Sequence, residues 1–301
     1  MFAVISSPTN LGLRPSGVER LPDALRQAGL QERLGARDAA TIAATAEYDA
    51  VRSPETGILN GPALRDTAHV LARAVADVIQ AGDVPIVLAG DCSVVLGALL
   101  GTRMAMRSQR VGLLFIDGHV DFYQPEASPT GEVADMDLAI ATGRGPAVLT
   151  ELDGAGPLVR DEDVVAFGAR DAEERDRAGS QDIRATGITL IELPEIRERG
   201  IDGAVDDALA VVASASRFWC HIDADVLDDA VMPAVDYRQP GGLTPSELAM
   251  LLRRAVATNR MAGVSLAIYN PELDPDGRCA RVLVDALVDG LANSLQRESL
   301  T

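Results

Sequence analysis

Residues 218–225 of the chain read FWCHIDAD, an apolar run that ends in two aspartates, Asp223 and Asp225. Two other segments, 86–93 (IVLAGDCS) and 113–121 (LLFIDGHVD), are built in the same way. An apolar run that stops at a carboxylate is typical of a buried strand that carries this group to the edge of a sheet. Three such strands lying side by side would bring their polar side chains into one crevice, which favours a metal site.

Strand and helix patterns alternate along the whole chain. We expect strands at 3–6, 86–89, 111–116, 163–168, 188–193, 217–222 and 263–268, and helices at 63–81, 94–107, 204–214, 278–295 and after a Thr244 cap. The apolar stripe of the first helix comprises Leu64, Val70, Leu71, Val75 and Val78. Residues 122–134 have no periodicity, and a loop of this length is usually functional. The alternation predicts one α/β domain, residues 1–301, with a doubly wound parallel sheet and helices on both faces.

Composition narrows the classes of function. The 301 residues are 47% hydrophobic and carry a formal net charge of −18. A nucleic-acid partner is not expected, because phosphate contacts need a basic surface, and anionic membranes are disfavoured for the same reason. The sequence contains no apolar stretch of membrane-spanning length and no signal peptide pattern. Three cysteines do not form a disulfide framework, so we expect a soluble, cytoplasmic protein.

The acidic segments have the pattern of a metal cluster. Asp117, His119 and Asp121 are two residues apart, so on an extended chain they point to the same side. Asp223 and Asp225 repeat this spacing on another strand. Carboxylates provide hard oxygen ligands and imidazole provides nitrogen. So many acids would repel one another at a buried rim unless cations were bound, and the pattern therefore predicts a metal site.

Cys92 has two interpretations from sequence. A buried cysteine is usually a small hydrophobic side chain. Here it follows Gly90-Asp91 at an expected strand-to-helix turn, where a thiolate could be stabilised and could bind a metal.

These motifs together resemble the ureohydrolase family, which includes arginase, agmatinase and formimidoylglutamase. The family motifs Gly-Gly-Asp-His-Ser, Asp-Ala-His-x-Asp and Ser-x-Asp-x-Asp-x-x-Asp-Pro match residues 89–93 (AGDCS), 117–121 (DGHVD) and 221–229 (HIDADVLDD). Residues 241–244 (GGLT) and 270–271 (NP) also fall where the family has such segments. The resemblance implies an arginase-like doubly wound fold, two Mn²⁺ ions and a homo-oligomer, as a trimer or hexamer.

The resemblance also implies roles for individual residues. The first ion would be held by Cys92, Asp117, Asp121 and Asp223, and the second by His119, Asp117, Asp223 and Asp225. Asp117 and Asp223 would bridge the ions, and water activated by the metals would attack a guanidine or amidine carbon. The residues expected in catalysis are Asp117, His119, Asp223 and His221, the last either as a proton shuttle or as a core histidine.

Several positions depart from the family pattern. Cys92 replaces the first histidine ligand, which favours zinc or a single ion over a manganese pair. Ile268 occupies the position of a glutamate that pairs with the substrate guanidinium, and Ala134-Asp135 replaces a His-Gly pair. We therefore do not expect ordinary arginase activity. The residues expected to contact substrate are Tyr123, Thr130, Glu132, Asp135 and Asp171.

Two alternatives remain open at this point. The thiol of Cys92 is compatible with a single-zinc amide hydrolase, similar to the deacetylases that share this fold. The changes at Ala134 and Ile268 are compatible with a non-catalytic member of the family that binds a ligand or partner.

Overall fold

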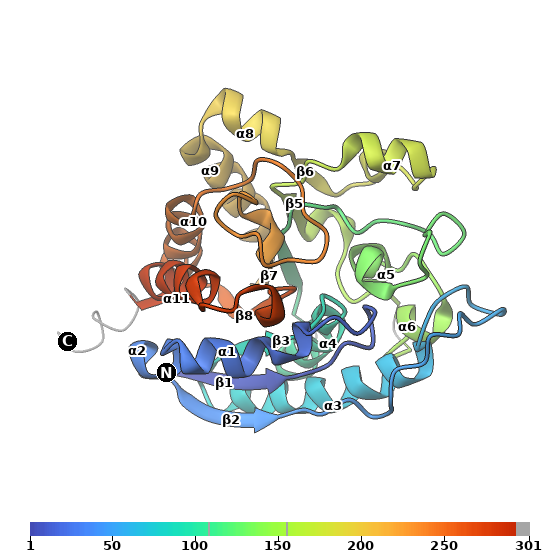
Figure 1. Cartoon of the computed structure of the whole chain (residues 1–301), viewed down its shortest axis with the longest axis horizontal. Helices are drawn as coiled ribbons and strands as arrows, with labels where there is room; N and C mark the ends of the chain where they lie inside the picture. Colours follow the sequence, from blue (N-terminus) through green and yellow to red (C-terminus); the bar gives the residue numbers. More distant parts are fainter. Residues whose placement is uncertain (108, 155, 293–301) are drawn as a thin grey trace.

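The structure, a computed structural model, describes residues 1–107, 109–154 and 156–292. Its centre is one eight-stranded sheet in the order β2-β1-β3-β8-β7-β4-β5-β6, and every neighbouring pair is parallel (Figure 1). The strands are β1 (Phe2–Ser7), β2 (Arg37–Thr41), β3 (Val84–Ala89), β4 (Val111–Ile116), β5 (Val164–Phe167), β6 (Thr189–Ile191), β7 (Arg217–Asp223) and β8 (Met261–Ala267). The predicted α/β class with a doubly wound parallel sheet is confirmed.

Helices cover both faces of the sheet, and a separate hydrophobic core lies on each side. One core contains residues of α1, α2 and α9 to α11, and the other contains residues of α3 to α6. The helices are α1 (Leu21–Gln27), α2 (Leu30–Leu34), α3 (Gly61–Gln80), α4 (Val94–Met106), α5 (Asp137–Ala141), α6 (Ala147–Thr150), α7 (Ala172–Ala178), α8 (Leu193–Arg199), α9 (Ile201–Val212), α10 (Pro245–Ala257) and α11 (Arg278–Leu291). Among the helices that the structure describes, none has the length and hydrophobicity of a membrane span.

Most elements lie where the local patterns place them. The strand predicted at 111–116 matches β4 residue for residue. At the start of α10, the Glu247 amide donates to Thr244 Oγ1 at 3.2 Å and the Thr244 amide donates to Glu247 Oε2 at 2.7 Å, so the predicted cap is a complete capping box. The helix predicted at 278–295 ends at Leu291, and its last predicted residues, 293–295, lie outside the described part of the chain.

Several predictions were incomplete or wrong. The edge strand β2 was missed because its sequence, RDAAT, shows no alternation of apolar and polar residues and is mostly exposed. The short helices α1 and α2 were missed too, and α9 begins at Ile201, three residues before its predicted start. On α3, Val70 is 42% exposed and does not belong to the buried stripe.

The strand order determines which side chains meet. The three acid-bearing strands were expected to be immediate neighbours, but β8 lies between β3 and β7, while β7 and β4 are adjacent. All strands are parallel, so their carboxyl ends lie at one edge of the sheet. The loop after β8, which begins with Ile268, therefore enters the site between the metal-ligand segments.

Close packing at the turn after β3 leads to a stability prediction. A Cβ atom at Gly90 would overlap the carbonyl oxygen of Thr9, which is backbone and cannot move aside easily. We expect Gly90→Ala to lower the free energy of unfolding by about 2–3 kcal/mol. The matched control is Gly203→Ala on exposed α9, where nothing lies within 4 Å and alanine should add about 0.5–1 kcal/mol. Denaturant titration measures both, and equal stability of the two variants would contradict the prediction.

Candidate metal centre

Three strand ends deliver metal-ligating groups to one point. Asp117 directly follows β4, Asp223 is the last residue of β7, and Cys92 lies in the turn after β3. All three are buried. The thiol of Cys92 donates to Asp223 Oδ2 at 2.9 Å, and one ligand atom from each of the three residues lies within 4.8 Å of the other two. The predicted convergence of these residues is therefore present in the structure.

A second set of ligand atoms lies beside the first. Asp117, His119 and Asp225 each offer one atom within 4.8 Å of the others. His119 Nδ1 lies 3.0 Å from Asp225 Oδ2 and 3.7 Å from Asp117 Oδ1. Because Asp117 is common to both sets, the arrangement is that of two neighbouring cation positions with a shared carboxylate.

Backbone amides hold the carboxylates in place. The amide of Gly118 donates to Asp225 Oδ1 at 3.1 Å, that of His119 to Asp117 Oδ1 at 2.7 Å, and that of Asp225 to Asp223 Oδ1 at 2.7 Å. Each aspartate thus has one oxygen fixed by the backbone. Asp117 Oδ2 is buried without a hydrogen-bond partner in the described structure, which is the state expected of an oxygen that binds a cation.

The electrostatics of the cluster favour added positive charge. Burial, and next the charge of Asp225, raise the pKa of Asp117 to about 6. Burial, followed by the charges of Asp225 and Asp117, raises the pKa of Asp223 well above its usual range. Burial opposes protonation of His119, but the charges of Asp225 and Asp117 outweigh it and hold the pKa of His119 well above its usual range. A bound cation would replace this proton and stabilise the ionised carboxylates, so the donor set fits divalent metal ions.

Cys92 does not behave as the turn position predicted. Burial, followed by the charges of Asp223 and Asp137, raises the pKa of its thiol well above the usual range. The expectation that the strand-to-helix turn stabilises a thiolate is therefore wrong for the protein without a bound metal ion. A thiolate at this position requires a metal ion, because a coordinated thiol loses its proton.

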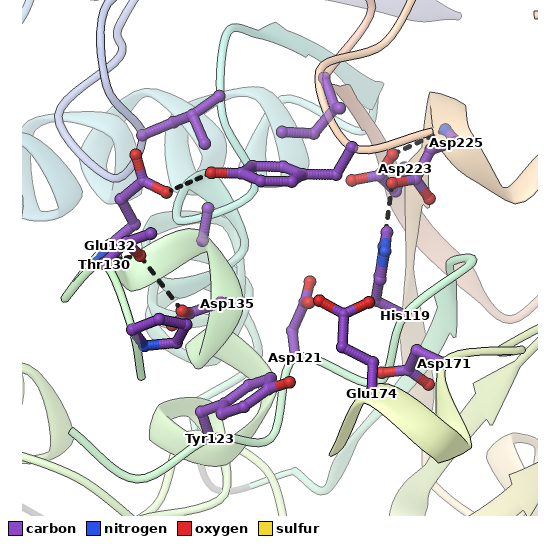
Figure 2. A pocket seen from close by; sticks show the side chains of 15 residues that line it. His119, Asp121, Tyr123, Thr130, Glu132, Asp135, Asp171, Glu174, Asp223 and Asp225 are labelled. Carbon is purple, nitrogen blue, oxygen red and sulfur yellow. Dashed lines mark hydrogen bonds and ion pairs between the residues drawn. The ribbon is translucent and has the colours of Figure 1, made fainter. Parts of the chain in front are cut away.

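A cavity of about 100 Å³ opens beside the cluster (Figure 2). His119, Asp121, Asp223 and Asp225 line it on the side of the cluster. All five residues predicted to contact substrate also line it, namely Tyr123, Thr130, Glu132, Asp135 and Asp171. The cavity therefore connects the metal centre with the long loop that follows β4.

Glu132 and Asp135, the two acids in the long loop after β4, differ in their hydrogen-bond partners. Glu132 is 4% exposed, and its two oxygens accept from the Arg14 amide at 2.9 Å and from the Tyr237 hydroxyl at 2.8 Å. Asp135 accepts from Ser128 Oγ at 2.6 Å through Oδ2, while its Oδ1 has no partner among the described residues. Burial raises the pKa of Asp135 to about 7. Of the two acids, Asp135 therefore keeps an oxygen without a partner among the described residues.

The Arg170-Asp171 pair mainly supports the backbone of the site. Asp171 accepts from Arg175 Nε at 3.0 Å and from the Val120 amide at 3.3 Å, so it fixes the segment that carries His119. Arg170 donates to the carbonyl oxygen of Asp225 at 2.7 Å and does not line the cavity. Arg170 therefore supports the segment that carries Asp225.

The two substituted positions give the cavity an apolar wall. Ala134 and Ile268 both line it, in the places where a histidine and a glutamate were expected from the resemblance. Ile268 adopts φ = 71°, which is strained for a β-branched residue, and its amide donates to the Gly90 carbonyl at 2.8 Å. Glu272, the next acid along the chain, instead pairs with Arg20 at 3.1 Å and is away from the cavity.

His221 and Asp137 lie behind the cluster, away from the cavity. Both are fully buried, and neither lines the cavity. Burial lowers the pKa of His221 to about 3, so its imidazole is neutral near pH 7. The role of His221 as a proton shuttle stays a prediction.

Sequence patterns did not identify Asp137, because an acid at the start of an apolar helical run looks like an ordinary helix cap. They also did not identify the cavity residues Tyr237 and Glu174.

Comparison with known proteins agrees with this geometry. Residues 1–292 match the model of the arginase family. Arginase from Bacillus caldovelox is 30% identical over 94% of this chain and 95% of its own length. The crystal structure of arginase from Bacillus cereus has a TM-score of 0.84 at 30% identity and covers 97% of this chain and 98% of its own. Proclavaminate amidino hydrolase from Streptomyces clavuligerus shares the fold, with a TM-score of 0.70 at 20% identity, covering 97% and 91% of the two chains.

The fold and the site together define a metal-dependent hydrolase that acts on carbon–nitrogen bonds of guanidino compounds. The chain belongs to the arginase family.

Proposed function

We propose that the protein uses two divalent ions, Mn²⁺ as the family resemblance implies, to hydrolyse a linear guanidino or amidine compound other than arginine. Cys92, Asp117, Asp121 and Asp223 would hold the first ion, and His119, Asp117, Asp223 and Asp225 the second. The observation that carries the proposal is the pair of ligand sets that share Asp117, each with atoms within 4.8 Å of one another. Asp121 belongs to neither set but lines the adjoining cavity, so its part as a ligand is a proposal alone.

When bound, divalent ions lower the pKa of water and so supply a nucleophile at neutral pH. The chain's own contribution is positioning: the amides of Gly118, His119 and Asp225 fix one oxygen of each of three carboxylates. Asp135 can hold a proton near neutral pH on the wall of the cavity, because burial raises its pKa to about 7 and one oxygen is unpaired. Tyr123 and Thr130 complete the wall on the loop side.

The apolar wall limits the charge of the substrate. A guanidinium ion placed against Ile268 and Ala134 would lose water without gaining a carboxylate, which costs several kcal/mol. A less basic group, such as a hydroxyguanidine or a formimino group, depends less on a carboxylate partner in the protein. The fold itself does not decide the substrate, since it is shared by proteins named arginase and proclavaminate amidino hydrolase.

A panel of linear compounds tests the proposal. The Mn²⁺-loaded protein is incubated with arginine, agmatine, a hydroxyguanidine and a formimino amino acid, and released urea, hydroxyurea, formamide or ammonia is measured. We expect kcat/KM for a weakly basic member to exceed that for arginine at least tenfold. Turnover of arginine at the highest rate would reject the substrate part of the proposal, and no turnover of any member would reject hydrolysis of this class.

Cys92 favours one second candidate, a single-zinc amide hydrolase, because thiolate prefers zinc to manganese. Hydrolysis of an acylated amine but of no amidine, with one zinc per chain, would support it. A non-catalytic role is less favoured, because a protein without turnover gains nothing from Asp117, Asp223 and Asp225 buried together at an electrostatic cost.

Ile268→Glu should increase the preference for a fully charged guanidinium. The new carboxylate would lie on the cavity wall, and glutamate fits the positive φ no worse than a β-branched residue. A charged hydrogen bond of about 1.5–3 kcal/mol predicts a KM for arginine lowered about 10- to 100-fold. Steady-state kinetics measures this, with Ile268→Gln as the uncharged control of equal size. If Ile268→Gln lowers the KM for arginine as much as Ile268→Glu does, the effect does not come from the charge of the new side chain.

We also propose that the protein is a cytoplasmic homo-oligomer, a trimer or hexamer as in the resembled family. All three cysteines are free, which supports a reducing compartment. Light scattering of the purified protein would give the number of chains.

A further inference from the structure

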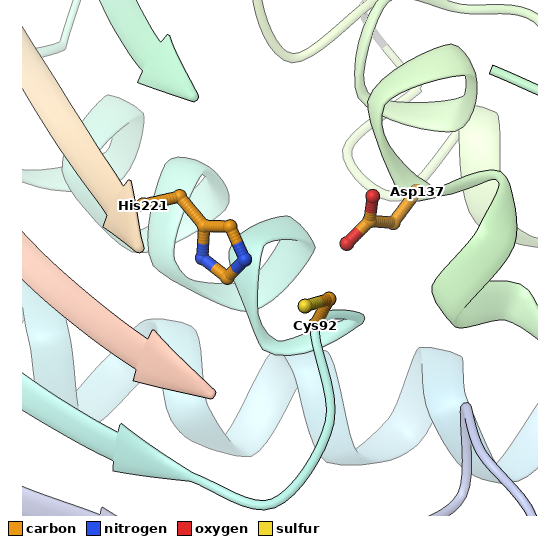
Figure 3. A group of neighbouring side chains, drawn as sticks. All are labelled: Cys92, Asp137 and His221. Carbon is orange, nitrogen blue, oxygen red and sulfur yellow. The ribbon is translucent and has the colours of Figure 1, made fainter. Parts of the chain in front are cut away.

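Cys92 has a second group of neighbours, Asp137 and His221, that belong to neither ligand set implied by the family resemblance. Its sulfur, a carboxylate oxygen of Asp137 and a ring nitrogen of His221 all lie within 4.8 Å of one another. Figure 3 shows the three side chains converging from different elements: the turn after β3, the start of α5 and strand β7. All three residues are fully buried, and none lines the substrate cavity.

Polar atoms in this group lack partners. Both carboxylate oxygens of Asp137 and Nε2 of His221 are buried and make no hydrogen bond within the described ranges. Buried polar atoms are nearly always satisfied, and an unpartnered carboxylate is among the most costly groups to bury. Three chemically different ligand groups that face one another and leave these atoms unpaired have the character of a metal-binding site.

We propose that Cys92 Sγ, one oxygen of Asp137 and His221 Nε2 bind a thiophilic divalent cation, Zn²⁺, in the interior of the protein. Sulfur, nitrogen and oxygen are the ligands that zinc takes, at about 2.0–2.3 Å in a tetrahedron, which separates the ligand atoms by about 3.3–3.7 Å. Small side-chain movements from the observed arrangement reach this spacing. One thiolate, one carboxylate and a neutral imidazole balance the two charges of the ion, so the buried site is electrically neutral.

The surroundings of His221 suit a ligand. Its Nδ1 lies 2.8 Å from Ser265 Oγ, which also accepts from Trp219 Nε1 at 2.9 Å. A serine oxygen can accept two hydrogen bonds, so the Nδ1 proton can be donated to Ser265 and Nε2 then keeps its lone pair. The ring also stacks on Phe115, with centroids 5.1 Å apart. These contacts fix the ring with Nε2 available to a metal.

This site differs from the first position implied by the family motifs. Two of its ligands, Asp137 and His221, lie outside those motifs' ligand sets. Cys92 can bind only one ion at a time, so with Zn²⁺ on its sulfur the first ion of the proposed pair would be held by Asp117, Asp121 and Asp223. A fourth position can be filled by water, which leaves the site electrically neutral. A His221 nitrogen bound to metal cannot carry a proton, so ligation and the proton-shuttle role exclude each other. The inference does not rest on the proposed reaction, because metal binding is measured without substrate.

Cobalt binding tests the assignment. Metal-free protein is titrated with Co²⁺, and the thiolate-to-cobalt charge-transfer absorption reports an ion bound to sulfur. We expect this band in the wild type and in the control variants Cys220→Ser and Asp225→Asn. Asp137→Asn and His221→Gln should weaken Co²⁺ binding at sulfur at least 100-fold. Retention of the band with unchanged affinity in both variants would assign Cys92 to the carboxylate set instead and overturn the proposal, as would a wild type without the band.

A second measurement covers the case in which those two variants fail to fold. X-ray absorption at the zinc edge is recorded on the His119→Asn variant with one equivalent of Zn²⁺. Of the three histidines in the sequence, only the partly exposed His69 and the buried His221 then remain. We expect one sulfur and one imidazole around the same ion. Sulfur without imidazole, or imidazole without sulfur, would refute the site whatever the enzymatic activity.

Discussion

Replacing Asp223 with asparagine is expected to lower kcat/KM of the Mn²⁺-loaded protein by about 1,000-fold or more. Asp223 is the proposed bridge between two ions, and its oxygens meet both the Cys92 thiol and the Asp225 amide. Asparagine keeps the shape but removes the charge that binds both cations. A loss of about 4 kcal/mol in transition-state stabilisation, in the range expected for a disrupted metal centre, corresponds to this factor.

The matched control is Asp229→Asn. Asp229 lies on the loop after the same strand and pairs with Arg238 at the surface, 3.2 Å away, so its change should alter kcat/KM less than twofold. Metal content and thermal unfolding of both variants are measured with the kinetics, to separate lost ions from lost folding. A folded Asp223→Asn variant with near wild-type turnover would exclude the two-ion scheme.

Removal of metal is expected to abolish hydrolysis and to lower the unfolding midpoint. An ion present at 100 times its dissociation constant stabilises the native state by about 2.7 kcal/mol. For a chain of 301 residues, that corresponds to a midpoint about 4 °C higher than in the metal-free protein. Dialysis against a chelator, followed by return of Mn²⁺ or Zn²⁺, measures both effects and shows which ion restores activity.

The metal-free protein should also have a characteristic pH dependence. Burial raises the pKa of Asp117 from the unfolded value of about 4 to about 6, so in this interval the native state holds more protons than the unfolded state. Stability of the metal-free protein therefore falls as pH rises from about 4 to about 6. With metal bound, stability instead falls as pH decreases, because protons then displace the ion from the carboxylates. Identical pH profiles with and without metal would show that no cation occupies the cluster.

Local sequence patterns were enough to predict the class of fold and the central carboxylates of the candidate site. Strand β4 and its terminal Asp117, and the capping box at Thr244, depend on contacts within a few residues, and apolar periodicity reports such contacts directly. The spacing of Asp223 and Asp225 after a buried strand likewise predicted that these carboxylates would meet Asp117, because parallel strands end at one edge.

The tertiary structure alone decided which groups share the interior. Nothing local shows that β8 lies between β3 and β7, or that Tyr237 reaches Glu132 over 105 residues of sequence. Asp137 resembled a helix cap until the fold placed it beside Cys92 and His221. The physical reason is that burial and electrostatic environment arise from segments distant in sequence, whereas periodicity records only each segment's own exposed and buried faces.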